Sequence, residues 1–371
     1  MVRYLSEYKY TYKIFTVSKS NEYTKCLLES GLTVGFLTEK SLTILPDNHV
    51  TEIKESELER MSVFCEGDIL EISENGIIYR WYSVLEGDAG IATTCACNSN
   101  CIMCPASEME RKQVNSTKLE NIFTVLKHMP RDLWYFTITG GEPTLIGEEN
   151  FIKVLESVKE NLPLTKILLL TNGRTLGDKS FYERFVKSKP ERLRVAIPIH
   201  GSTAEKHDYI TQAKGSYIQT LRGIANLLNS GVELEIRIVV SKLNSDDITE
   251  ISKMIANVFP SVTVVNFVGL EMRGNCVANS DEVLISYQDA FKSSTEGIDL
   301  LVRKGINVGL YNFPHCMIDK KYWPIAQKSI SAYKSMFYNE CEQCELKNEC
   351  CGIFTATMNY YKPKVYPIVQ E

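Results

Sequence analysis

Residues 97–104 read Cys97-Asn-Ser-Asn-Cys101-Ile-Met-Cys104, three cysteines separated first by three residues and then by two. Cysteine thiolates hold iron–sulfur clusters, and most clusters take four of them. A tight group of only three therefore predicts a cluster with one iron open to a ligand that is not protein. The competing interpretation is a zinc site, which normally closes with four Cys or His ligands in two paired blocks. His128, the nearest downstream histidine, lies in a predicted helix without a paired ligand, so we favour the cluster.

Apolar, β-branched runs alternate with helical patterns after these cysteines. Strands are expected at 91–94, 134–139, 166–171, 192–199, 232–241 and 262–269, and helices at 117–129, 149–161, 178–187, 216–230 and 246–258. This alternation predicts an α/β fold with a parallel sheet and right-handed crossovers. Six β/α steps are too few for a closed eight-stranded barrel, but ligands should still gather at the carboxyl ends of the strands.

The ends of three predicted strands carry candidate cofactor-binding residues. Paired glycines let the backbone approach a ligand closely, and the first of these turns contains such a pair. The second turn, at Thr171 and Asn172, could equally be an ordinary turn at the end of a strand. At the third turn, His200 is followed by His207 and Asp208, and a hydrogen-bonded loop histidine is the simpler interpretation. The candidates are Gly140, Gly141, Glu142 and Pro143, then Thr171 and Asn172, and then His200.

Arg237 is a further candidate because it lies inside the fifth predicted strand. An unpaired buried charge is very costly, so a buried arginine needs an anionic partner. A bound ligand carboxylate is one such partner. Glu235 or Glu233 is the other, since alternation along the strand places all three side chains on one face.

A second cysteine group occupies the C-terminal part of the chain. Cys341, Cys344 and Cys350 form the pattern CxxCx5C, and Cys316 precedes them at a distance. Four thiolates complete a closed cluster, although they suit a structural zinc ion equally well. Because Cys351 follows Cys350 directly, the sequence does not determine which of the two is the ligand. The remaining cysteines belong to no motif and are expected to be small buried residues: Cys26, Cys65, Cys95, Cys276 and Cys351. Cys95 is the exception to test, because it lies two residues before Cys97 and could face the same side of the strand.

The Cx3CxxC spacing together with Gly140-Gly-Glu-Pro143 resembles the radical S-adenosylmethionine (SAM) superfamily. The resemblance implies a partial (β/α)6 barrel of the TIM type over about residues 88–275. It also implies a 4Fe-4S cluster on Cys97, Cys101 and Cys104, whose open iron is chelated by SAM. In this superfamily the Gly-Gly-Glu-Pro backbone binds the amino group of SAM, and reductive cleavage yields a 5′-deoxyadenosyl radical.

The C-terminal cysteines resemble the SPASM and twitch domains, which hold auxiliary 4Fe-4S clusters. This chain has too few cysteines for two complete auxiliary clusters, so the resemblance implies one, on Cys316, Cys341, Cys344 and Cys350. Further sequence motifs are similar to those of the maturases of the His-Xaa-Ser peptide system, at residues 97–105, 139–145, 207–210, 214–216, 266–271, 310–314 and 329–331.

That similarity implies a ribosomally made precursor peptide as substrate, modified by a crosslink, a thioether or epimerisation. It also implies a flavodoxin- or ferredoxin-type reductant and a companion maturase as partners. Two alternatives stay open: a radical SAM enzyme acting on RNA or a small metabolite, and a non-catalytic zinc-binding interaction protein. No catalytic side chain can be named, because none of the 19 tyrosines stands out.

Composition indicates a soluble cytoplasmic protein with several domains. No apolar signal segment follows Met1, no run reaches the roughly 18 apolar residues of a membrane helix, and the net charge of −5 argues against general nucleic-acid binding. The 12 cysteines fall largely into metal-type motifs, which favours a reducing compartment. We expect a small β-rich domain at 1–87, the barrel at 88–295 and the auxiliary-cluster domain at 296–371.

The N-terminal domain contains a predicted hairpin at 67–80, because Asn75-Gly76 separates two β-prone runs. Such a domain could dock a leader peptide by strand addition. It could equally cap the open side of the barrel, and the sequence leaves both roles open.

Overall fold

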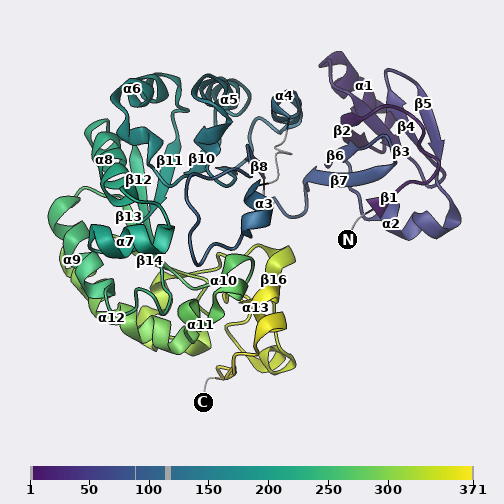
Figure 1. Ribbon diagram of the computed structural model, residues 1–371. Helices are drawn as coiled ribbons and strands as arrows, with labels where there is room; N and C mark the ends of the chain where they lie inside the picture. Colours follow the sequence, from purple (N-terminus) through teal and green to yellow (C-terminus); the bar gives the residue numbers. More distant parts are fainter. Residues whose placement is uncertain (1–2, 88, 113–117, 370–371) are drawn as a thin grey trace.

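The computed structural model describes residues 3–87, 89–112 and 118–369. It contains a seven-stranded sheet, an eight-stranded sheet and a two-stranded sheet. In Figure 1 the smaller domain, built from the N-terminal strands, stands to one side of the curved, helix-covered sheet.

The eight-stranded sheet is parallel throughout, and its strands lie side by side in chain order from β8 to β15. The strands are β8 (Gly90–Ala92), β9 (Tyr135–Thr139), β10 (Lys166–Leu170), β11 (Leu193–Pro198), β12 (Glu233–Val239), β13 (Val264–Val268), β14 (Val308–Tyr311) and β15 (Ala326–Gln327). The first six correspond to the six predicted strands, and β14 and β15 extend the sheet. The predicted α/β class with a partial parallel barrel is confirmed.

Helices connect these strands and cover the outer face of the sheet (Figure 1). They are α4 (Leu119–His128), α5 (Glu148–Asn161), α6 (Lys179–Ser188), α7 (Ala204–Thr211), α8 (Ser216–Asn229), α9 (Ile248–Val258) and α12 (Tyr287–Arg303). In α5 the buried side chains Phe151, Val154, Leu155 and Val158 recur at the spacing of one helical face. Thr117, where the first helix was expected to begin, lies outside the described residues.

In β12 and β13 the fully buried apolar side chains recur at every second position, so they lie on one face of the sheet. Leu234, Ile236 and Ile238 of β12 are fully buried, as are Val265 and Phe267 of β13. They belong to one continuous core that joins the sheet to its helices.

The N-terminal domain is the seven-stranded sheet, in the order β1-β7-β6-β2-β3-β4-β5, with a core of its own. Its strands are β1 (Arg3–Tyr4), β2 (Lys13–Ser18), β3 (Val34–Leu37), β4 (Ser41–Leu45), β5 (His49–Glu52), β6 (Ile69–Ile72) and β7 (Ile77–Tyr82), and its helices are α1 (Asn21–Glu29) and α2 (Leu58–Ser62). The predicted hairpin is the antiparallel pair β6–β7.

Two polar contacts connect this domain to α4 of the barrel. The Thr16 hydroxyl lies 2.8 Å from Nδ1 of the buried His128, and Asn121 donates to the Tyr12 hydroxyl at 2.7 Å. The domain is therefore attached to the side of the barrel that carries its first long helix.

The chain after α12 returns to the barrel before it forms the C-terminal part. Beyond β15 it makes the short hairpin β16 (Ser335–Met336) and β17 (Ile353–Phe354), followed by α13 (Thr355–Tyr360). The expected domain boundary between residues 295 and 296 falls inside α12. Among the residues that the structure describes, no helix is long and apolar enough to cross a membrane.

Candidate functional site

Cys97, Cys101 and Cys104 lie together in the loop between β8 and α3 (Glu108–Lys112), each partly exposed. Backbone bonds hold this loop against α7. The Asn100 N–H donates to the Thr211 carbonyl, and the Ile102 N–H donates to the Ile210 carbonyl, both at 2.9 Å. The barrel thus fixes the backbone between the first and last cysteine.

Two asparagines of the short α10 (Asn275–Ala278) region brace the same loop from the other side. The Asn275 side chain donates to the Cys101 carbonyl at 3.0 Å, and its N–H donates to the Cys104 carbonyl at 2.9 Å. Asn279 donates to the Ile102 carbonyl at 3.0 Å. Sequence reasoning missed both residues, because isolated polar residues about 175 positions away carry no motif.

Burial raises the pKa of the Cys97 thiol and raises the pKa of the Cys101 thiol to about 12. The negative charges of neighbouring groups act in the same direction. Thiolates are the form that binds metal, so these side chains need a positive partner to ionise at neutral pH.

The Gly140-Gly141 turn packs directly on the strand that leads into the cysteine loop. Gly140 has φ +149°, and a Cβ there would lie 2.4 Å from the Thr94 carbonyl oxygen. A Cβ on Gly141 would lie 2.3 Å from the Cys95 carbonyl oxygen. The Gly141 and Glu142 N–H groups donate to the Thr94 and Ala96 carbonyls at 2.8 Å. The glycines are needed here because two backbones touch.

Glu142 is fully buried, and its carboxylate connects the ends of β9 and β10. It accepts from the Thr171 hydroxyl at 2.8 and 2.9 Å, from the Asn172 N–H at 2.7 Å, and from the hydroxyl and N–H of Thr144 at 2.8 and 3.2 Å. Burial raises the pKa of Glu142, while these donors act in the opposite direction. Glu142 and Thr171 therefore bond to each other here, and their predicted contact with a cofactor stays a prediction.

Asn172 and Arg174 extend this network to the cysteine loop. The Asn172 side chain donates to the Asn98 side chain at 2.6 Å. Arg174 donates to the Asn98 carbonyl and, at 3.1 Å, to the Ser99 hydroxyl. The end of β10 thus supports the loop between Cys97 and Cys101. Arg174 belongs to no sequence motif and was not predicted.

His200 lies at the end of β11, buried, with no partner for its Nδ1 atom among the described residues. Burial, assisted by His207, lowers the pKa of His200 to about 3, so the ring is neutral at physiological pH. The backbone N–H of His200 donates to Nδ1 of His207 at 3.3 Å. Asp208 faces away and bonds to Ser216 and Tyr217 at 2.8 Å, which secures the start of α8.

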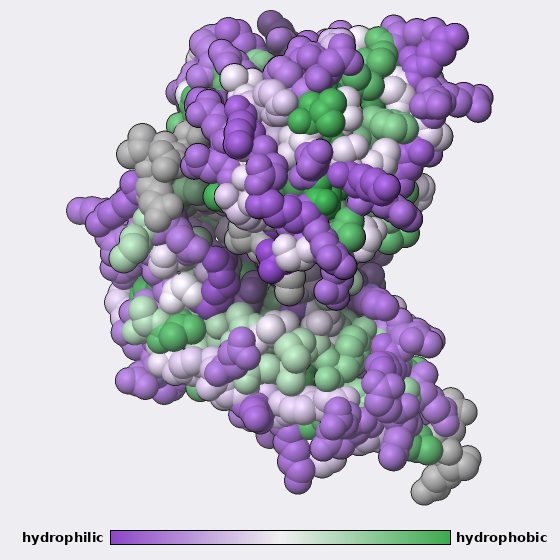
Figure 2. Space-filling view, turned by 90° about the vertical axis from the view of Figure 1, so that its right-hand side faces the viewer, coloured by the Kyte–Doolittle hydropathy of each residue, from purple (hydrophilic) through white to green (hydrophobic). Residues whose placement is uncertain are grey.

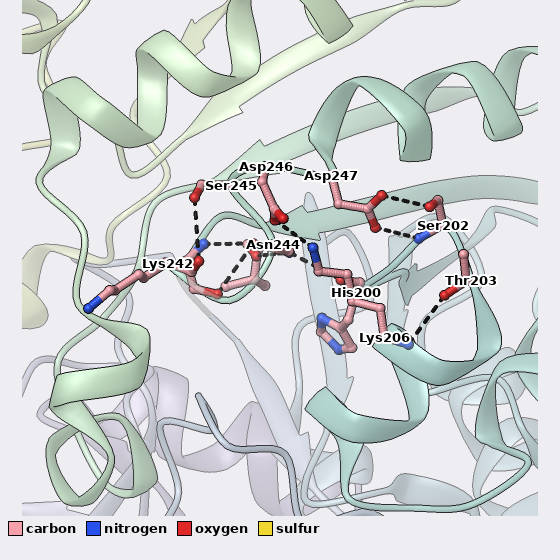
Figure 3. A network of polar contacts seen from close by, with 11 residues as sticks. His200, Ser202, Thr203, Lys206, Lys242, Asn244, Ser245, Asp246 and Asp247 are labelled. Atoms are coloured by element: carbon pink, nitrogen blue, oxygen red, sulfur yellow. Dashed lines mark hydrogen bonds and ion pairs between the residues drawn. The ribbon is translucent and has the colours of Figure 1, made fainter.

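The loops after β11 and β12 hold His200 in place (Figure 3). Asn244 donates to the His200 carbonyl at 3.3 Å, and Asp247 accepts from the N–H and hydroxyl of Ser202 at 2.7 and 2.6 Å. Lys206 and Asp246 add an ion pair of 2.5 Å at the surface. These contacts fix the backbone of the loop that carries His200.

Arg237 pairs with the buried Glu235, Nε to Oε1, at 2.6 Å. This is one of the two partners that the sequence left open. Glu233 pairs with Arg194 instead. The Arg237 guanidinium also lies 5.6 Å from the Tyr311 ring centre and lines the large cavity described next, so it remains a candidate ligand-binding residue.

One large cavity, of about 1300 Å³, opens inside the barrel sheet. Cys101 and Cys104 line it beside His200 and Arg237. The N-terminal domain contributes Arg3, Arg80 and Trp81 to its wall, and the C-terminal part contributes residues 327–331, Tyr333, Lys334 and Phe354. Figure 2 shows how the surface is hollowed near the middle of one face.

The four C-terminal cysteines line a second, smaller cavity together with His315. Within the described parts of the chain, no three His, Cys, Asp or Glu side chains form a group recognisable as a site for a single ion. Cys350 faces the cavity, whereas Cys351 is 2% exposed and packs with Ile330 and Phe354. The geometry therefore favours Cys350 over Cys351 as the fourth ligand.

His315 is buried beside this group, and its Nδ1 atom has no partner in the described structure. Of the cysteines outside the motifs, Cys276 and Cys351 are buried as expected. The expectation is wrong for Cys26, which is exposed, and Cys65 is partly exposed. Cys95, which was set apart as the exception, is exposed.

Residues 91–255, from β8 into α9, match the Radical SAM superfamily. This part of the chain carries all three cysteines of the loop, the Gly-Gly-Glu-Pro turn, His200 and Arg237. Residues 91–255 are a radical SAM domain. The family uses a 4Fe-4S cluster and SAM. The residues of this domain fit that group, because three thiols lie in one braced loop and two of them face a cavity with room for a further ligand.

Two curated proteins are similar over the radical SAM domain. The AdoMet-dependent heme synthase of Methanosarcina barkeri (strain Fusaro / DSM 804) is 27% identical over 160 residues, 42% of this chain and 43% of that protein. The sporulation killing factor maturation protein SkfB of Bacillus subtilis (strain 168) is 24% identical over 165 residues, 44% of this chain and 38% of that protein. The chain thus matches less than half the length of either relative.

Among solved structures, Streptococcus suis SuiB bound to the precursor peptide SuiA has a TM-score of 0.48 and 15% sequence identity. The match covers 60% of this chain and 48% of SuiB.

Proposed function

We propose that the chain is a radical SAM enzyme that modifies a ribosomally made peptide by hydrogen abstraction. The observation that carries the proposal is the cavity of about 1300 Å³ in front of Cys101 and Cys104. Pockets for small ligands usually measure about 300–1,000 Å³, so this cavity has room for a peptide segment beside SAM. The relative SkfB is named as a maturation protein, which supports the same substrate class.

Each part of the chain has a role in this proposal. When bound, the cluster and SAM supply a carbon-centred radical able to take hydrogen from an unactivated C–H bond. Cys97, Cys101 and Cys104 hold the cluster, and the Gly140–Pro143 turn, Asn172, His200 and Arg237 surround SAM. The N-terminal domain and the C-terminal segment flank the cavity and exclude water from the reacting atoms.

The proposal extends to the second cysteine group. Cys316, Cys341, Cys344 and Cys350 would hold one auxiliary 4Fe-4S cluster, which would supply an electron acceptor or a binding site for the substrate. A low-potential flavodoxin or ferredoxin supplies the electron for SAM cleavage, a companion maturase acts on the same peptide, and the reaction takes place in the reducing cytoplasm.

Anaerobic reconstitution with iron and sulfide tests the proposal. We expect about eight irons per chain, and 5′-deoxyadenosine from SAM under dithionite. Cys101→Ala should abolish nucleoside formation, whereas Cys344→Ala should lose about four irons and keep it. Incubation with precursor peptides encoded beside this gene should yield a peptide that has lost a pair of hydrogens or gained solvent deuterium. Zinc in both sites, without nucleoside, would refute the proposal.

A further inference from the structure

Arg111 is a buried cation that follows the cysteine loop directly. It lies in α3 and is only 8% exposed. Its guanidinium donates to the Ala106 carbonyl at 2.5 Å and to the Asn100 side-chain oxygen. Both acceptors are uncharged, and both belong to the segment that carries the three cysteines.

The carboxylates nearest in sequence have other partners. Glu108 pairs with Lys112 at 2.5 Å, and Glu110 pairs with Arg273 at 2.6 Å. In the parts of the chain that the structure describes, no carboxylate lies within ion-pair distance of Arg111. A buried charge without a counterion is strongly destabilising, and arginine does not lose its proton. The position therefore calls for an anion that the chain itself does not supply.

The anion that fits is the group held by the cysteines. Asn100 directly precedes Cys101 and Ala106 follows Cys104 by two residues, so the hydrogen bonds of Arg111 place its charge beside the cysteine loop. Three thiolates outweigh the positive charge of a 4Fe-4S core, and each electron added makes the cluster more negative. Net charge and hydrogen bonding near the ligands are the means by which proteins set cluster potentials.

We propose that Arg111 is the countercharge of the cluster on Cys97, Cys101 and Cys104, a positioning residue that favours the reduced cluster over the oxidised one. Arg111 is hydrogen-bonded to the loop through Ala106 and Asn100, and its positive charge lies beside the cluster that takes up the electron. The inference rests on the radical SAM chemistry proposed above but concerns electron uptake, which precedes any contact with peptide.

The test is a redox titration followed by electron paramagnetic resonance on the full-length, reconstituted protein without SAM. A Cys341→Ala, Cys344→Ala background leaves a single cluster to observe. Arg111→Met removes the charge, Arg111→Gln removes it while keeping a donor for Ala106, and Arg111→Lys keeps it. Lys112→Met is the matched control, because Lys112 is the exposed neighbour in the same helix.

At a fixed potential we expect Arg111→Met and Arg111→Gln to lower the ratio of reduced to oxidised cluster about tenfold, or about 59 mV for one electron. Arg111→Lys should retain most of the ratio, and Lys112→Met all of it. Unchanged midpoints in both neutral variants with full iron content would overturn the inference. An unchanged midpoint combined with weaker SAM binding would also overturn the inference, because Arg111 would then bind the SAM carboxylate and would not compensate the charge of the cluster. Failure of the proposed function is distinguishable, since it would show in the parent protein as missing iron or missing nucleoside.

Discussion

Replacement of Glu142 separates a structural role from a ligand-binding one. Glu142→Gln preserves the shape of the side chain and one carbonyl oxygen, which can still accept from Thr144 and Thr171. The new amide group, however, faces the Asn172 N–H, which now lies 2.7 Å from a carboxylate oxygen. Loss of one hydrogen bond to a charged acceptor costs about 1.5–3 kcal/mol, so we expect a destabilisation of about 2 kcal/mol.

Glu142→Ala removes every acceptor at once. The threonine hydroxyls can rotate toward other acceptors, but the N–H groups of Thr144 and Asn172 stay buried and unsatisfied. At about 1–3 kcal/mol for each buried donor, we expect a loss of about 4 kcal/mol in the free energy of unfolding. This is a large part of the roughly 5–15 kcal/mol that stabilises a typical protein.

Urea denaturation of the metal-free, reduced protein measures both losses. Glu148→Gln is the control, because Glu148 makes an exposed ion pair with Arg184 and should change stability by no more than about 1 kcal/mol. If Glu142→Ala unfolds at the urea concentration of the parent protein yet abolishes SAM cleavage, the reasoning is refuted. The carboxylate would then act on the cofactor and not on the framework.

Three further predictions follow from buried groups and close contacts. Burial lowers the pKa of His128 to about 4, from an ordinary value of about 6.5, so the ring takes up a proton on unfolding. Stability is therefore complete above about pH 6.5 and falls by up to about 3 kcal/mol toward pH 4, and His128→Gln should flatten this profile in urea denaturation. His200 and His207 add losses of the same sign. Cys350→Ala should lose about four irons of about eight, whereas Cys351→Ala should keep them; the reverse result would reassign the ligand. Gly140→Ala should destabilise far more than Gly147→Ala, because both glycines have positive φ but only Gly140 touches another backbone; equal thermal shifts would argue against that contact.

The strands and helices of the barrel were predictable because each buries an apolar face, which leaves a regular pattern of apolar residues along the chain. Strand β12 lies inside its predicted range, and α5 matches its own within one residue. β14 and β15 were not predicted, since they span only four and two residues and are partly buried. Short strands carry too little pattern to separate them from loops.

The candidate site was predictable only where residues cluster along the chain. The spacing of Cys97, Cys101 and Cys104 identifies them as candidate ligands. Asn275 and Arg174 support the same loop from distant segments, and Arg111 is a single charge in an ordinary helical stretch. Their roles depend on which distant segments the fold brings together, and the local sequence pattern around each residue does not show these contacts.

The braces on the cysteine loop set an order of events in synthesis. The loop is made early, yet its supports come from β10, α7 and finally Asn275 and Asn279, about 175 residues later. Contacts this far apart form late, because the intervening chain must first be made and closed into the barrel. A nascent chain that ends before Asn279 carries all three thiols but not the geometry to hold them. We therefore expect cluster insertion to require a chain that has been made at least to Asn279.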